Sequence, residues 1–216
     1  MKLNRKNSWK CLGAVLISAA LSLPALAADP DAPKKDEKQP SEAEMMAMMT
    51  ELAKPGENHK LMEGLVGTWT YKVKWWMSPE AAPSESTGTS VGRAVMGGRY
   101  FISDHTGKMQ MPGLDGKLMD MEFKGMSVDG YDNVKKKFVS SWIDNMGTGI
   151  MNLEGTYDAD AKTFTYNGEY EPMPGMKTRM REVIKVTDKN HRTFEFFEDR
   201  GGKEVRTMEI NYTRKS

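Results

Sequence analysis

Short segments of alternating apolar and polar residues fill the chain from Val66 to Arg214, and each is closed by a turn signal. In residues 69–77, every odd-numbered position is apolar or aromatic, which is the period of a strand that buries one face. No helical pattern follows Gly64. Roughly ten such strands joined by hairpins predict an all-β fold, an antiparallel up-and-down β-barrel. A two-sheet sandwich is the alternative that the same alternation allows.

The strand boundaries follow from the positions of the turn signals. The predicted strands are 69–77, 85–96, 99–106, 119–129, 138–144, 151–157, 163–170, 179–186, 193–198 and 205–213. Asn167-Gly168 is either a bulge within one strand or a turn that divides it. A barrel of this size encloses more space than the smallest filled barrels do. The barrel domain is expected to span residues 58–216.

The N-terminus has the pattern of an export signal. Its first ten residues carry four basic side chains and no acidic one, and a mostly apolar run follows over residues 11–23. Ala25 and Ala27 then match the small-x-small pattern that a signal peptidase reads. The run is shorter than the about 20 residues that span a bilayer. We expect residues 1–27 to be a cleaved signal peptide, which leaves a periplasmic or secreted protein with no integral membrane segment.

Two further zones precede the barrel. Residues 28–40 are rich in proline and charge with almost nothing apolar, which is typical of a disordered tether. Ser41 and Glu44 then form a capping box, so a Met-rich amphipathic helix is expected over residues 41–54. We expect this helix either to cover the barrel opening, with its apolar face buried, or to dock on a partner or a membrane surface; that face is formed by Met45, Met48, Met49 and Leu52. Asn58 is expected to cap a second, short turn.

The composition of the chain excludes thiol chemistry and argues against nucleic-acid binding. The only cysteine, Cys11, lies in the signal, so thiol chemistry and disulfides are excluded from the exported chain. Four of the 31 basic residues and none of the 30 acidic ones lie in residues 1–27, which leaves a net charge of −3 with mixed signs. Without a basic stripe, nucleic acid is not an expected partner. No motif for a cofactor is present, and none is expected.

Several motifs carry a resemblance to known proteins. Gly67-Thr68-Trp69 resembles the Gly-x-Trp start of lipocalin-type (calycin) barrels, in which the tryptophan plugs one end. Four further segments resemble the exported bacterial domain-of-unknown-function family 1579: 97–100, 130–134, 141–149 and 209–214. This likeness extends over nearly all of residues 59–215. It implies a calycin-like barrel and brings no established activity.

Catalysis is a minority hypothesis. The chain has only three histidines, and none has the spacing of a usual zinc site. Asp104, His105 and Asp144 would have to converge at a barrel mouth to act as acid–base groups. The simpler alternative is that they cap turns and pair with Arg99.

Methionine suggests a second function. Eighteen methionines remain after residue 27, and thioethers are soft ligands that suit Cu(I). The candidate ligands are Met109, Met111, Met173 and Met176. Apolar packing or ligand contact by these flexible side chains is the alternative.

The leading hypothesis is a binding module for a small apolar or amphipathic ligand held inside the barrel. Its expected lining residues are Trp69, Tyr71, Trp75, Phe123, Trp142, Asp144 and Tyr166. Arg99, Arg179 or Arg181 would fix a carboxylate or other polar head if they point inward. Alternation shows which side chains face inward but leaves open whether they line a cavity or fill the core.

The export signal gives a first prediction. In a bacterial host, the exported protein should begin at Ala28, because cleavage follows the small-x-small site at Ala25 and Ala27. N-terminal sequencing of protein from the periplasm and the medium tests this. An intact N-terminus on membrane-bound protein would contradict it and indicate an uncleaved anchor.

Overall fold

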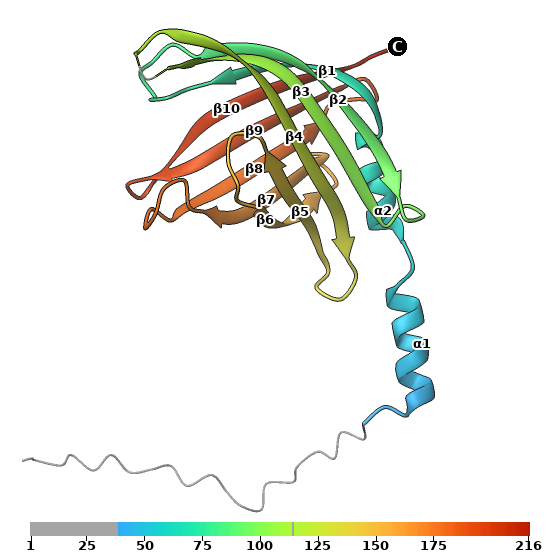
Figure 1. Ribbon diagram of the computed structural model, residues 1–216. Coiled ribbons are helices and arrows are strands. Elements are labelled where there is room, and N and C mark those ends of the chain that lie inside the picture. Colours follow the sequence, from blue (N-terminus) through green and yellow to red (C-terminus); the bar gives the residue numbers. More distant parts are fainter. Residues whose placement is uncertain (1–38, 114) are drawn as a thin grey trace, which may run out of the picture. The chain divides into compact units, whose positions relative to one another are not determined.

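The computed structural model describes residues 39–113 and 115–216, and these form a closed ten-stranded antiparallel barrel (Figure 1). The strands are β1 Gly67–Trp75, β2 Ser84–Val95, β3 Tyr100–Pro112, β4 Leu118–Asp132, β5 Lys137–Asp144, β6 Met151–Asp158, β7 Thr163–Tyr170, β8 Thr178–Val186, β9 His191–Arg200 and β10 Lys203–Arg214. Each strand pairs with its neighbours in the chain, and β1 pairs with β10. The up-and-down barrel is thereby confirmed and the sandwich alternative is wrong. The predicted signal peptide and most of the predicted tether lie outside the described residues.

Two details of the strand prediction are resolved by the pairing. β7 is one continuous strand, so Asn167-Gly168 does not divide it. β3 continues to Pro112, six residues beyond its predicted end at residue 106. β4 begins at Leu118, which pairs with Pro112. Gly107 does not end the strand, because it pairs with Phe123. The alternation actually continues through Met109 and Met111 in one long hairpin.

From residue 39 onward, three short helical segments precede the barrel: α1 Glu42–Leu52, α2 Glu57–Leu61 and the 3-10 segment η1 Met62–Leu65. The capping box is confirmed, since the Glu44 backbone N–H donates to Ser41 Oγ (3.3 Å) and the Ser41 N–H donates to Glu44 Oε2 (2.7 Å). The second helix begins two residues earlier than predicted. Gly56, not Asn58, is its N-cap, and the Gly56 N–H donates to His59 Nδ1 at 3.0 Å.

The expectation that α1 covers the barrel opening is wrong in this structure. None of its residues is buried, and its methionines are 48 to 65% exposed. Its C-terminal end is instead held by the β2–β3 and β4–β5 turns. Asn133 Nδ2 donates to the Leu52 and Lys54 carbonyls, and Arg99 Nε donates to the Ala53 carbonyl (2.8, 2.9 and 2.9 Å).

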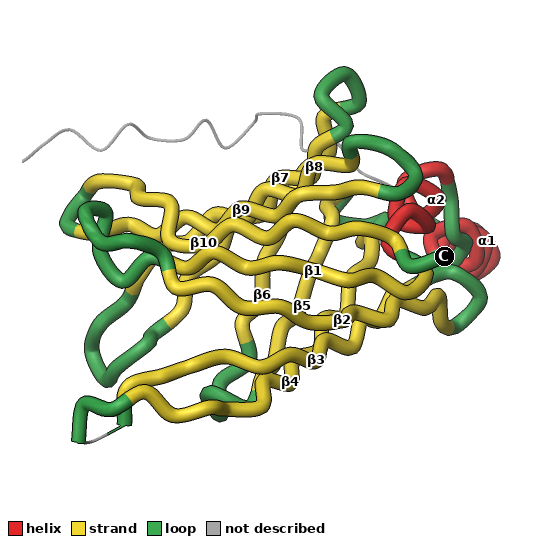
Figure 2. The backbone as a smooth tube through the Cα atoms, turned by 90° about the horizontal axis from the view of Figure 1, so that it is seen from above, coloured by secondary structure: helices red, strands yellow, loops and turns green. Residues whose placement is uncertain are grey.

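The barrel is plugged at the end from which the chain enters it. Met62 and Leu65 of η1 are buried in a cluster that includes Phe101, Phe138 and Phe164. Trp69 is also buried there, and its Nε1 donates to the Leu65 carbonyl (3.2 Å). Figure 2 shows the helices at this end and the tip of the β3–β4 hairpin at the other. Within the described part of the chain, no helix is long and apolar enough to cross a membrane.

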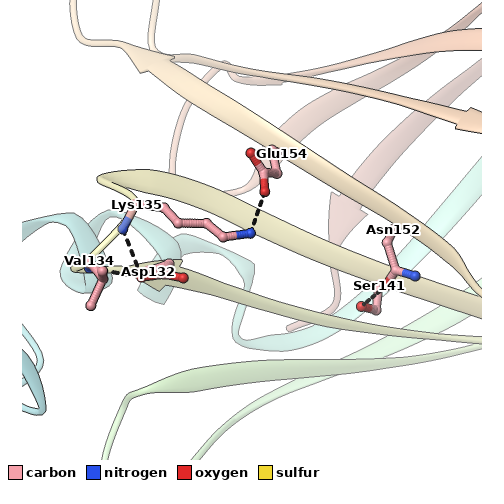
Figure 3. Close-up of polar contacts among 6 residues, drawn as sticks. All are labelled: Asp132, Val134, Lys135, Ser141, Asn152 and Glu154. Atoms are coloured by element: carbon pink, nitrogen blue, oxygen red, sulfur yellow. Dashed lines mark hydrogen bonds and ion pairs between the residues drawn. The ribbon is translucent and has the colours of Figure 1, made fainter.

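The outer wall is polar, and its contacts fix the turns and the strand register (Figure 3). In the β4–β5 turn, Asp132 Oδ1 accepts from the backbone N–H groups of Val134 (2.8 Å) and Lys135 (3.0 Å). Lys135 Nζ reaches Glu154 on β6 at 2.6 Å. These side chains face solvent, so the opposite face of the same strands is the one that encloses the interior.

The plug predicts a large stability difference between two methionines. Met62 is fully buried, whereas Met46 on α1 is 61% exposed. Met62→Ala should lower the free energy of unfolding by about 2–5 kcal/mol, because it leaves a cavity in the plug. Met46→Ala should change it by less than about 0.5 kcal/mol. Urea unfolding followed by tryptophan fluorescence measures both, and equal effects would contradict this account of the plug.

Candidate functional site

The strand register defines the residues that face the barrel interior. Residues directly paired across antiparallel strands point to the same side. Starting from the pair Tyr71 and Tyr212, whose rings lie 5.6 Å apart, this rule assigns the interior face around the whole ring. It includes all seven non-arginine residues expected to line the site: Trp69, Tyr71, Trp75, Phe123, Trp142, Asp144 and Tyr166. Their inward orientation agrees with the prediction, and their role in binding stays a prediction.

The three predicted arginines point outward, which corrects that part of the site. Arg99 lies exposed at the plugged end, where it contacts backbone carbonyls. Arg179 pairs with Asp199, and Arg181 makes two hydrogen bonds to Glu204 (2.8 and 2.6 Å). The reason is strand alternation. Met180 and Glu182 are the buried, inward positions of β8, so the arginines beside them face solvent.

Arg192 on β9 is the arginine that enters the barrel. It is only 5% exposed, and its guanidinium carbon lies 4.4 Å from the Trp69 ring centre and 4.5 Å from that of Tyr212. Its Nη1 is buried without a hydrogen-bond partner, and the ion pairs found among the described residues do not include it. Burial lowers the pKa of Arg192, but a guanidinium stays protonated at physiological pH. A buried cation therefore has one donor nitrogen free.

Two buried carboxyl groups share the interior with Arg192. Asp129 comes from β4, on the wall opposite β9, and accepts a hydrogen bond from Ser127 Oγ (2.7 Å). Glu182 comes from β8. Burial raises the pKa of Asp129, and burial followed by repulsion from Asp129 raises the pKa of Glu182 to about 8. Glu182 is therefore mostly protonated at neutral pH. Burial likewise raises the pKa of Tyr166, its partner on β7.

The three residues of the catalytic alternative do not converge. Asp104 lies on the outer face, where it pairs with Arg93 and not with Arg99 as expected. His105 and Asp144 face inward and both contact Trp142. The His105 ring centre is 5.2 Å from that of Trp142, and Trp142 Nε1 donates to Asp144 Oδ2 at 2.7 Å. Burial lowers the pKa of His105 to about 4, so the ring is neutral at pH 7.

The end opposite the plug is apolar and open. Trp69, Phe101, Phe138 and Phe164, which face the interior near the plug, are buried, whereas a set of interior-facing residues nearer the other end is only half-buried. The half-buried set comprises Val73, Trp75, Phe123, Trp142, Phe194, Phe196 and Ile210. The hollow of about 430 Å³ formed by β2, β3 and β4 is not part of this interior, because most of its lining residues, Lys108 and Glu122 among them, occupy outward-facing positions. The interior thus combines a half-exposed aromatic mouth with a buried polar floor.

The sequence contained signals for the residues that were missed. Arg192 alternates with Phe194 and Phe196, but the strand was predicted to begin at residue 193 and so omitted it. Glu182 alternates with Met180 and Ile184 in a strand that was predicted correctly. A charged residue at an inward position of a strand is the pattern that would have identified both.

The candidate metal ligands are placed differently from the expectation. Among the described residues, no three His, Asp or Glu side chains gather as a metal site requires. Met173 and Met176 lie in the exposed connection between β7 and β8. Met109 and Met111 lie on β3, where they pair with Met121 and Met119 on β4. Met109, Met111, Met119 and Met121 therefore face one another across β3 and β4, whereas Met173 and Met176 lie elsewhere.

Comparisons with known proteins identify a family and a fold. The family described as protein of unknown function, DUF1579, matches residues 54–214. The crystal structure of Rv2717c from M. tuberculosis is 12% identical, with a TM-score of 0.51 over 76% of this chain and 100% of that one. The S-type phycobiliprotein lyase CPES from Guillardia theta is also 12% identical, with a TM-score of 0.48 over 74% and 93%. No curated protein matches. At this identity the likeness to Rv2717c concerns the fold alone.

The buried carboxyl pair predicts a specific pH dependence of stability. Glu182 has a pKa of about 8 in the folded protein against an ordinary value of 4.5, so its contribution to stability is complete below about pH 4.5 and is lost as pH rises through 8. Glu182→Gln mimics the protonated form. Relative to wild type, the variant should gain stability between pH 5 and pH 9, by an amount of the order of a few kcal/mol. Urea unfolding across this range measures it, and parallel stability profiles would refute the burial of an ionisable Glu182.

Proposed function

This chain belongs to the DUF1579 family of proteins of unknown function, and we propose that it binds a small amphipathic molecule inside its barrel. The polar head of the ligand, a carboxylate, would be held at Arg192. Its apolar body would extend toward the half-buried aromatic residues of the open end. The protein would act as an exported carrier or receptor, in keeping with its N-terminal signal pattern.

The free donor of Arg192 is the observation that carries this proposal. A buried unpaired cation costs several kcal/mol, so folded proteins keep one where a ligand or water completes it. The aromatic rings of Trp69 and Tyr212 hold the guanidinium by cation–π contact and leave Nη1 available. A carboxylate is the group that best matches a guanidinium in charge and geometry.

The apolar lining supports the second half of the proposal. Ligand sites are mostly hydrophobic, with a few polar groups that fix orientation. The open end supplies large side chains such as Trp75, Phe194 and Phe196, each half-buried although it faces the interior. Since a chain-like ligand would cover these side chains, its binding would bury apolar surface from the mouth down to the polar floor.

Binding of a carboxylate should depend on Arg192. The probe is cis-parinaric acid, a fluorescent fatty acid that accepts energy from tryptophan. Arg192→Met should weaken its binding by about 10- to 100-fold, the effect of losing a hydrogen bond to a charged group. Arg179→Met is the matched control because Arg179 is exposed on the outer wall, and it should leave the affinity unchanged.

The methyl ester of the same probe separates head-group from body recognition. It retains the apolar chain but carries no charge, so Arg192→Met should affect it much less than the acid. Equal loss for acid and ester would indicate general damage to the interior. Absence of binding to the wild-type protein, together with a bare mass in native mass spectrometry of protein from the periplasm, would count against a carrier.

A further inference from the structure

The β3–β4 hairpin leaves the barrel wall and continues as a free ribbon. β2 pairs with β3 only as far as Lys108, and β5 pairs with β4 only from Gly125 onward. The pairing of β3 with β4 nevertheless continues to Pro112 and Leu118. Figure 2 shows this ribbon projecting at the lower left. Between residues 109 and 121 its two strands therefore pair only with each other.

The two faces of the ribbon have opposite chemistry. Met109 pairs with Met121 and Met111 with Met119, so all four side chains lie on one face. This face continues the barrel interior, because the next pair is Gly107 and Phe123. The other face is polar, with Lys108 opposite Glu122 and a hydrogen bond from Gln110 Nε2 to Asp120 Oδ1 (3.0 Å). We call the methionine face the Met tetrad: Met109, Met111, Met119 and Met121.

Core packing does not account for the Met tetrad. Met119 is 55% exposed, and the other three are half-buried, since no strand covers the ribbon on that side. None of the four belongs to either buried apolar cluster of the barrel. Ribbons usually place threonine, valine or aromatic residues at paired positions. Four unbranched thioethers at two consecutive pairs form an unusual and specific grouping.

The spacing allows the four sulfur atoms to meet. Directly paired residues have Cβ atoms roughly 4.5–5.5 Å apart, and Met has rotatable bonds that carry Sδ over the centre of such a square. Gly113 lies beside the group, where a Cβ would come within 3.2 Å of Met119 Sδ. Thioethers are soft donors, and an arrangement of several thioethers without a carboxylate or imidazole favours Cu(I) over Zn²⁺ or Mg²⁺.

We propose that the Met tetrad is a binding site for a single soft monovalent metal ion, Cu(I), at the mouth of the barrel. The site is independent of the proposed ligand at Arg192. It uses side chains of one hairpin, so the ion would bridge β3 and β4 and fix the ribbon. No electron transfer is required, because the ion binds as Cu(I).

The experiment is an anaerobic titration of the purified protein with Cu(I), in competition with a chromophoric Cu(I) chelator. Ag(I), which has the same charge and no accessible redox step, is the probe for NMR of protein with ¹³C-labelled methionine methyl groups. We expect one equivalent to bind and the methyl signals of the Met tetrad to shift together. They are assigned from single Met→Leu variants, which nearly conserve volume.

Three variants distinguish this site from other methionines. Combined Met→Leu changes at the four tetrad positions should weaken Cu(I) binding by at least about 100-fold, since even outer-shell groups can cost 10- to 100-fold in metal affinity. Two controls should leave it unchanged: Met173→Leu with Met176→Leu, and Met→Leu at the four methionines of α1. Circular dichroism and urea unfolding verify that each variant is folded. Wild-type affinity weaker than micromolar, or affinity retained by the tetrad variant, would overturn the proposal.

Discussion

The structure depends on the pairing of its first strand with its last. β1 and β10 pair along their length, from Trp69 opposite Arg214 to Trp75 opposite Met208, and this closes the ring. Closure removes the sheet edges that would otherwise be open to other chains. It also creates an enclosed space with two distinct ends. The buried polar residues of the candidate site lie in this enclosed space.

Trp69 connects the closure to the candidate site. Its ring contacts two guanidinium groups, with the Cζ of Arg214 at 4.1 Å and that of Arg192 at 4.4 Å from the ring centre. Arg214 also donates to the carbonyls of Val66 and Lys189 (2.6 and 2.7 Å), which joins the start of β1 to the β8–β9 turn. The aromatic residue that plugs the barrel thus also positions the cation inside it. The plug and the buried polar floor of the interior are therefore in direct contact.

The fold was predictable from the sequence because alternation and turn residues act locally. Ten strands, the Ser41 capping box and the inward side of the aromatic residues expected to line the site followed from short patterns. The candidate site was less predictable, because burial of Arg192, Asp129 and Glu182 depends on strands that are distant in sequence. An error of one or two residues at a strand start was enough to omit Arg192. The predicted lid failed for a related reason: an amphipathic helix does not encode which surface it meets, and α1 is attached at the plugged end.

Strand order also affects when the molecule can fold. The contacts of Arg214 with Gly64 and Val66 span about 150 residues, and none can form before the last strand is available. Until then, β1 and β9 are both unpaired edges with aromatic inward faces. Contacts this distant in sequence slow folding, and open edges associate readily. A nascent chain from which β10 has not yet emerged is therefore an incomplete cylinder, and the pairing of β10 with β1 and β9 completes it.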